Sequence, residues 1–138
     1  MSTGAKKTIL VVEDADAIRK MVCAMLTQNG YRCLEAVNGV DALRQLDGES
    51  IHLVLTDVVM PKMGGAELAK HLSKHRPETR IIFMSGYHED PVIRDLERSP
   101  ARFLAKPFTG AALMQKVRDI LENPWSGVSE IGTSSQPQ

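Results

Sequence analysis

Features that would point to several other protein classes are scarce or missing in this chain of 138 residues. It has two cysteines, Cys23 and Cys33, whose spacing fits neither a zinc site nor a disulfide framework. We therefore expect two reduced thiols. No apolar run approaches the roughly 18 residues of a membrane span, and the N-terminus is not a secretory signal peptide. We expect no membrane contact and a soluble, cytoplasmic chain.

An excess of charge of one sign is also missing. Lysine plus arginine and aspartate plus glutamate both number 17, so the net charge is zero. No basic stripe stands out, and contacts to nucleic-acid phosphates require clustered lysine and arginine. We therefore expect no nucleic-acid binding by this chain. The length suits a single domain with one sheet covered by helices on both faces.

The most informative stretch runs from Ile51 to Gly65. It starts as an apolar run of the length of a buried strand, reaches Asp57, and then enters a loop that contains Pro61 and paired glycines. Asp57 thus lies where a buried strand ends. In open α/β sheets, ligands bind at the carboxyl ends of the strands. Taken alone, such an acid is either a ligand or nucleophile, or a cap of the following loop.

Two further strands end in charged residues. The apolar run from Thr8 ends in Glu13 and Asp14, and the short run from Phe103 ends in Lys106. If the strands are parallel, these ends converge on Asp57. Three carboxylates placed together repel one another unless a cation joins them. Oxygen ligands favour Mg²⁺ or Ca²⁺, and a shallow site with few protein ligands favours Mg²⁺.

The remaining pattern alternates strands and helices. We predict a polar, disordered tail over 1–6, a folded domain over 7–123 and a flexible tail over 124–138. Strands are expected at 8–13, 31–37, 51–56, 80–84 and 101–105. Helices are expected at 15–28, 39–46, 65–74, from Asp90 to about 98, and from the Thr109 cap to 122. In the first helix, Arg19, Lys20, Cys23 and Thr27 are placed on the side away from the core, with Cys23 partly exposed.

Taken together, these motifs resemble a receiver domain of a two-component response regulator. They are the acid pair after the first strand, Asp57 after the third with Met60-Pro61-x-Met63-x-Gly65 behind it, Ser85-Gly86 after the fourth, and Lys106-Pro107 after the fifth. The resemblance covers residues 7–123. It implies a flavodoxin-like, doubly wound, five-stranded parallel sheet of order 2-1-3-4-5.

The resemblance also implies a role for each residue at the acidic end of the sheet. Asp57 becomes the acceptor of a phosphoryl group from a phosphohistidine donor. Asp14, Asp57 and the backbone carbonyl of Val59 become Mg²⁺ ligands. Glu13, which replaces the aspartate common at that position, acts through a water molecule.

Further residues are implied to bind the phosphoryl group and to transmit the signal. Lys106 pairs with Asp57 at rest and with the phosphoryl group afterwards, and its bond to Pro107 is cis. Ser85 binds a phosphoryl oxygen. Phe103 occupies the position of the switch aromatic, with a plain core role as the alternative. The output face then spans residues 91–122.

Two positions are implied to set how long the phosphoryl group survives, namely Val59 and Tyr87. The apolar Val59 cannot orient an attacking water. We therefore predict a long-lived phosphorylated form.

A second stripe on the first helix is small and apolar where solvent would be expected: Ala17, Met21, Ala24 and Gln28. Either it belongs to a wide buried face, or it is a docking surface for a partner helix. In receiver domains this helix is where histidine kinases and phosphotransfer proteins dock, and the two readings remain balanced. The downstream target is not indicated. A monomer is expected, with dimerisation on phosphorylation left open.

Competing functions fit the sequence less well. An aspartate-nucleophile phosphatase needs a second acid two residues after Asp57, where this chain has Val59. A binding-only pseudo-receiver would not need every reactive residue to be present. We expect no enzyme beyond self-catalysed phosphorylation and dephosphorylation, unless the chain is part of a hybrid histidine kinase. Phe103-x-x-Lys106-Pro107-Phe108 resembles receivers of such kinases, and a stand-alone regulator is equally open.

Overall fold

The computed structural model describes residues 6–86 and 102–124. Five parallel strands form one sheet in the order β2-β1-β3-β4-β5. The strands are β1 (Thr8–Val12), β2 (Arg32–Ala36), β3 (Leu53–Asp57), β4 (Arg80–Ser85) and β5 (Phe103–Ala105). This confirms the predicted fold and strand order. The helix expected from Asp90 lies outside the described residues.

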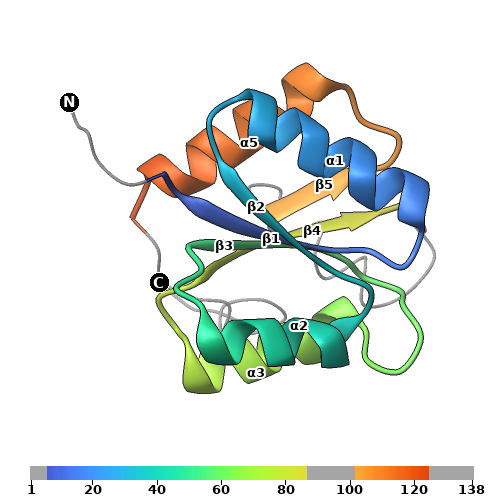
Figure 1. Ribbon diagram of the computed structural model, residues 1–138, viewed down its shortest axis with the longest axis vertical. Helices are drawn as coiled ribbons and strands as arrows, with labels where there is room; N and C mark the ends of the chain where they lie inside the picture. Colours follow the sequence, from blue (N-terminus) through green and yellow to red (C-terminus); the bar gives the residue numbers. More distant parts are fainter. Residues whose placement is uncertain (1–5, 87–101, 125–138) are drawn as a thin grey trace, which may run out of the picture.

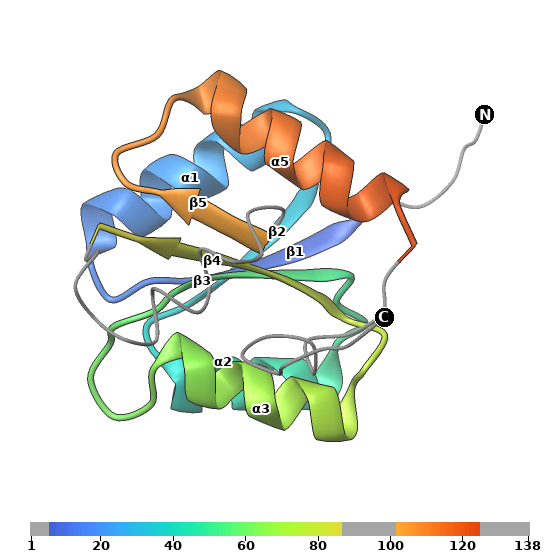
Figure 2. The same ribbon diagram turned by 180° about the vertical axis from the view of Figure 1, so that it is seen from behind.

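Four described helices cover the two faces of the sheet (Figures 1 and 2). Helices α1 (Asp16–Gln28) and α5 (Gly110–Glu122) lie on one face, and α2 (Gly39–Gly48) and α3 (Gly65–His75) lie on the other. The central strands are therefore apolar on both faces, as parallel strands between helix layers must be. Within the described residues, no helix combines the length and apolarity that crossing a bilayer requires.

The core is divided by the sheet into two clusters. Alternate residues of one strand point to opposite faces, so Leu10 packs towards α2 and α3 while Ile9 and Val11 pack towards α1 and α5. Helices α3 and α5 contribute Leu68, Leu72, Leu113 and Val117, which are almost completely buried. Thr109 caps α5 as expected, because its hydroxyl accepts a hydrogen bond from Ala112 N at 3.0 Å.

The structure shows how both flanks of helix α1 are placed. The stripe of Ala17, Met21, Ala24 and Gln28 is exposed, so a wide buried face is ruled out. On the side facing β2, by contrast, Arg19 and Cys23 are buried, although the sequence placed them away from the core. The reason is that β2 lies beside this flank of α1, which the periodicity of a single helix cannot reveal.

The cysteine prediction was wrong. Cys23 of α1 and Cys33 of β2 form a disulfide, and their Cα atoms lie 5.8 Å apart. Ten residues separate them in sequence, and the chain turns back between α1 and β2, bringing the two side chains together. The sequence spacing alone gave no sign of this, because the pairing depends on how α1 packs on the sheet.

Candidate functional site

The site lies at the carboxyl edge of the sheet, where β1, β3 and β5 end. Glu13 and Asp14 directly follow β1, Asp57 is the last residue of β3, and Lys106 directly follows β5. The parallel order places β1 next to β3, and this is where the strand order reverses direction. The topology therefore brings together the four residues that the sequence singled out, as expected for a doubly wound sheet.

Three carboxylates meet at this edge. Glu13, Asp14 and Asp57 each offer an oxygen atom, and these three atoms lie within 4.8 Å of one another. Asp14 is exposed, whereas Glu13 and Asp57 expose only 1% and 9% of their surface. The cluster thus combines two buried carboxylates with one, that of Asp14, which faces solvent. It is the only such group of potential metal ligands among residues 6–86 and 102–124.

The side chain of Lys106 contacts two carboxylates of this cluster. Its ammonium group lies 2.8 Å from Glu13 Oε1 and 3.6 Å from Asp57 Oδ1. The expected pairing with Asp57 is present, but the shorter contact is to Glu13. Burial by itself lowers the pKa of Lys106, but the hydrogen bond to Glu13 and the charge of Asp57 outweigh burial and raise it. Lys106 therefore stays charged and offsets part of the carboxylate repulsion.

Asp57 is held in place but poorly neutralised. Its Oδ1 accepts a hydrogen bond from Val58 N at 2.9 Å. Burial, and next the nearby Glu13 carboxylate, raise the pKa of Asp57 to about 6, against the opposing effect of Lys106. A cation bound between these acids would stabilise the charged form of Asp57. The oxygen-only donor set, with one open side, fits a hard ion such as Mg²⁺.

The strand-end residues around Asp57 are positioned by backbone contacts. Ser85 ends β4, is fully buried, and its carbonyl accepts a hydrogen bond from Lys106 N at 3.0 Å. Val58 N donates to the carbonyl of Met84 at 3.1 Å, which ties the loop after β3 to β4. Val59 is 46% exposed in that loop. The Lys106–Pro107 bond is cis, as predicted.

Phe103 and Tyr87 complete the predicted set. Phe103 begins β5, is partly buried and packs against the core cluster on the α2 and α3 side. In register it pairs with Phe83 of β4, two residues before the Ser85–Ala105 pair. Tyr87 lies outside the described residues, and so do residues 91–101 of the expected output face. The described part of that face is β5 and α5.

Arg19 supports the site from α1, a role that was not predicted from the sequence. Its guanidinium donates to the backbone carbonyl of Glu13 at 2.9 Å and to Asp16 and Glu35 at 2.7 and 2.9 Å. Arg19 is 6% exposed, so it fixes the start of α1 against the end of β1 from inside the protein. Its spacing from Asp16 was a weak signal, because pairs three apart meet on a helix. Glu35 could be found only from the tertiary structure.

Comparison with protein families identifies the family that the sequence motifs resemble. The family model of the response regulator receiver domain matches residues 9–118. Among curated proteins, the chain is 41% identical over 118 residues to the sensor kinase CckA of Brucella abortus, where it covers 83% of this chain but only 12% of that kinase. It is also 33% identical to the response regulator receiver protein CpdR of the same organism, covering 83% of this chain and 97% of CpdR.

Solved structures agree with both the fold and the family. The receiver domain of the hybrid histidine kinase CckA is similar with a TM-score of 0.69 and 33% identity, over 83% of this chain and 99% of that one. A CheY-like receiver domain protein from Methanospirillum hungatei has a TM-score of 0.76 and 27% identity, over 86% of this chain and 95% of that one. The shared region is the folded domain that contains the acidic cluster.

Proposed function

The chain belongs to the response regulator receiver domains of two-component signalling, and from this premise we propose that Asp57 accepts a phosphoryl group from a phosphohistidine. The observation that carries the proposal is the placement of Asp57 between Glu13, Asp14 and Lys106 at the end of β3. A carboxylate can act as a nucleophile towards phosphorus and form an acyl phosphate. An oxygen of Asp57 bonds to phosphorus as the bond from phosphorus to the donor imidazole nitrogen breaks, and that nitrogen keeps the electron pair.

Asp57 must be ionised to attack. With a pKa of about 6, it is mostly a carboxylate at neutral pH and needs no base. The difficulty is charge, since an anion approaches an anionic phosphoryl group beside two further acids. Lys106, 3.6 Å from Asp57, can move its ammonium contact from the carboxylates to the phosphoryl oxygens.

The metal that this site would hold is Mg²⁺. Asp14 and Asp57 would be its side-chain ligands, Val59 would offer its backbone carbonyl, and Glu13 would act through water. When bound, Mg²⁺ supplies positive charge that offsets the three carboxylates and the phosphoryl group. The exposure of Asp14 leaves the site open to solvent for the ion and the donor.

Signal output is proposed to follow from Ser85 and Phe103. Phosphorylation adds negative charge and acceptor oxygens next to the end of β4. Ser85 then hydrogen-bonds a phosphoryl oxygen, and the partly buried Phe103 moves into the space released. The change reaches a downstream partner through β5, α5 and residues 91–101.

The exposed stripe of α1 is the proposed docking surface for the donor, either a histidine kinase or a histidine phosphotransfer protein. Ala17, Met21 and Ala24 are exposed, and Met21 exposes 47% of its surface. Small and flexible apolar side chains on a helix face suit packing against a partner helix. Such a system places the chain in the cytoplasm, either as a single-domain regulator or as the receiver part of a hybrid kinase.

The test is phosphorylation of the chain by acetyl phosphate with Mg²⁺, read by intact mass. We expect a gain of one phosphoryl group in the wild type and none in Asp57→Asn or without Mg²⁺. The matched control Asp47→Asn changes an exposed acid on α2 and is expected to be labelled like the wild type. Labelling of Asp57→Asn would show that another residue is the acceptor. A wild type that no donor labels would instead favour a binding-only domain.

A second prediction concerns the lifetime of the phosphorylated chain. The apolar, 46% exposed Val59 cannot hold a water molecule for attack on the phosphoryl group. We expect loss of phosphate to be slow, and Val59→Asn, which adds a polar group that can orient water, to be several-fold faster. The labelled sample, freed of donor, is followed by mass over time. Equal decay of the two proteins would contradict this role.

A further inference from the structure

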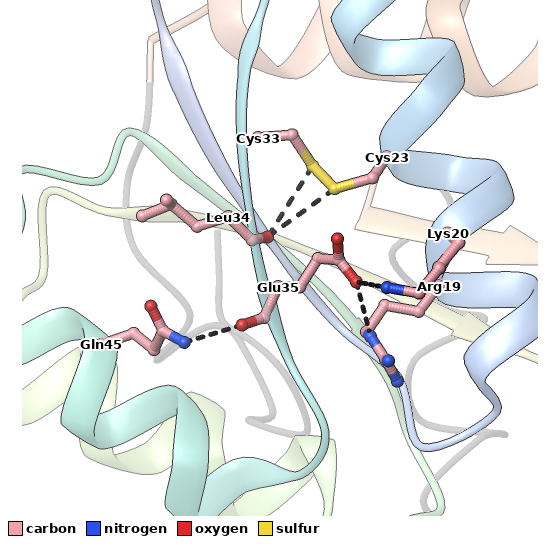
Figure 3. Close-up of a disulfide and its surroundings, with 7 residues drawn as sticks. All are labelled: Arg19, Lys20, Cys23, Cys33, Leu34, Glu35 and Gln45. Atoms are coloured by element: carbon pink, nitrogen blue, oxygen red, sulfur yellow. Dashed lines mark hydrogen bonds and ion pairs between the residues drawn. A yellow bond between two sulfur atoms is a disulfide. The ribbon is translucent and has the colours of Figure 1, made fainter.

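The disulfide lies on the seam between α1 and the edge strand β2. Cys23 is in the middle of α1 and Cys33 is in β2, and their Cα separation of 5.8 Å is within the usual range for disulfides. Figure 3 shows the bond bridging helix and strand. Strand β2 is at the end of the described sheet order and pairs with β1 alone, and α1 packs against it along this seam.

Charged contacts join the same two elements closer to the acidic cluster. Glu35 of β2 accepts hydrogen bonds from Arg19 at 2.9 Å and from Lys20 at 3.3 Å (Figure 3). Arg19 also bonds the carbonyl of Glu13. The seam therefore runs from the disulfide, through Glu35 and Arg19, to the first residue of the acidic pair.

A small molecule can reach the disulfide from solvent. A shallow surface pocket of about 460 Å³ is lined by both cysteines together with Lys20, Ala24, Thr27, Gln28 and Glu35. Cys23 is 8% exposed, and Cys33 is the more accessible of the two. Lys20, whose side chain is 65% exposed, stands at the rim and can attract an anionic thiol such as glutathione.

The same surroundings suit the reduced pair. The carbonyl oxygen of Leu34 lies 4.0 Å from the sulfur of Cys23 and 3.7 Å from that of Cys33. A disulfide sulfur carries no hydrogen to donate, whereas a thiol can donate weakly to this oxygen. Two thiols would therefore find an acceptor in place, and neither oxidation state requires the fold to change.

We propose that Cys23 and Cys33 are a reversible thiol–disulfide modification site that clamps α1 to β2 and exchanges with low-molecular-weight thiols such as glutathione. A glutathione thiolate attacks the more accessible sulfur, that of Cys33, and Cys23 leaves as the thiolate. A second glutathione thiolate then attacks the glutathione sulfur of the mixed disulfide and releases Cys33. Overall, the protein disulfide and two glutathione thiols give two protein thiols and one glutathione disulfide.

The clamp borders the exposed stripe of α1, because Ala24 and Gln28 line the disulfide pocket and also belong to the stripe. In the reducing cytoplasm, a disulfide is typically transient and redox-sensing rather than structural. The oxidised form holds the helix rigid and the reduced form lets it move. That this movement would tune docking of the phosphodonor rests on the function proposed above, whereas the exchange itself does not.

The exchange is tested on the 138-residue chain in buffers of varied reduced and oxidised glutathione. Free thiols are trapped by alkylation and counted by intact mass. We expect a reversible change from no alkyl groups to two across the series, with the same endpoint from either direction. Cys23→Ser and Cys33→Ser should instead carry one glutathione under oxidising conditions. Two free thiols in every buffer, or a disulfide that survives the most reducing one, would overturn the proposal.

The clamp is tested by hydrogen exchange of the oxidised and reduced proteins. We expect amides of α1 and β2 to exchange several-fold faster after reduction, with β3 and β4 unchanged. The double variant Cys23→Ser with Cys33→Ser should match the reduced protein in either buffer. Identical exchange of α1 in both states would overturn the clamp. Labelling with acetyl phosphate, which needs no docking, is measured in parallel. It tests the proposed acceptor role of Asp57 separately from the proposed thiol–disulfide site.

Discussion

Replacing Asp57 by asparagine is expected to abolish phosphorylation and, without Mg²⁺ at neutral pH, to raise the free energy of unfolding by about 1–2 kcal/mol. The variant loses the nucleophile but keeps an oxygen that can accept the hydrogen bond from Val58 N. It also removes a buried negative charge that lies beside Glu13. A substitution that stops function would thus stabilise the fold.

The magnitude follows from the pKa of Asp57. Folding, chiefly through burial, raises it from 3.8 to about 6, and two pKa units correspond to roughly 3 kcal/mol. We expect about half of this, because the carboxylate keeps some contact with water at the open side of the site, and an amide also loses the attraction to Lys106.

The sign of the pH dependence is fixed by the same shift. A carboxyl whose pKa is raised on folding binds its proton more tightly in the folded state, so the wild type loses stability as pH rises through the interval between the two values. The difference between variant and wild type should be small below about pH 4, grow up to about pH 6 and then level off. Asp47→Asn, at an exposed position, should show little such growth.

Urea unfolding of both proteins from pH 4 to 8, with and without Mg²⁺, measures these differences. If Mg²⁺ binds at the acidic cluster, it should stabilise the wild type more than Asp57→Asn. The difference in free energy of unfolding between the two proteins should then become smaller. The prediction fails if the wild type is more stable than Asp57→Asn at neutral pH without Mg²⁺. That result would show that the surroundings of Asp57 favour its ionised form.

Gly65→Ala is expected to lower the free energy of unfolding by about 3 kcal/mol, which corresponds to about 10 °C in Tm for a chain of this size. A Cβ atom on Gly65 would overlap the backbone carbonyl oxygen of Asp57 and approach Thr56 Cγ2 to 3.2 Å. The obstacle is the backbone of β3, which cannot rotate away like a side chain. Relief therefore requires α3 or the end of β3 to shift.

The same shift should reduce labelling of Asp57, because the acceptor is the residue that Gly65 contacts. Gly48→Ala is the matched control. It makes the same chemical change at the end of α2, where an added Cβ would meet nothing within 4 Å. We expect it to change stability by less than about 1 kcal/mol, in the favourable direction. The free energies of unfolding of Gly65→Ala and Gly48→Ala are measured by thermal and urea unfolding. Equal stabilities of the two variants would show that β3 accommodates the methyl group.

Much of the site was predictable because its residues are tied to strand ends. Apolar runs that end in Glu13, Asp14, Asp57 and Lys106 locate the acidic edge once the strands are taken as parallel, and the strand order brings these ends together. The pattern that marks a buried strand and the charge that ends it are both local in sequence. For that reason the parallel sheet and the acidic cluster were anticipated correctly, whereas the strand order and the cis bond before Pro107 were implied by the resemblance to receiver domains.

What the sequence by itself determined about this protein is therefore its fold class, its family and the residues at the acidic edge. Only the tertiary structure decided the surroundings of α1: the burial of Arg19 against Glu13 and Glu35, the exposure of the stripe around Met21, and the Cys23–Cys33 disulfide. The physical reason is that helix periodicity gives one core-facing side, whereas the flanks of α1 depend on which neighbour packs there. Here that neighbour is the edge strand β2, whose position is set by sheet order and not by local sequence.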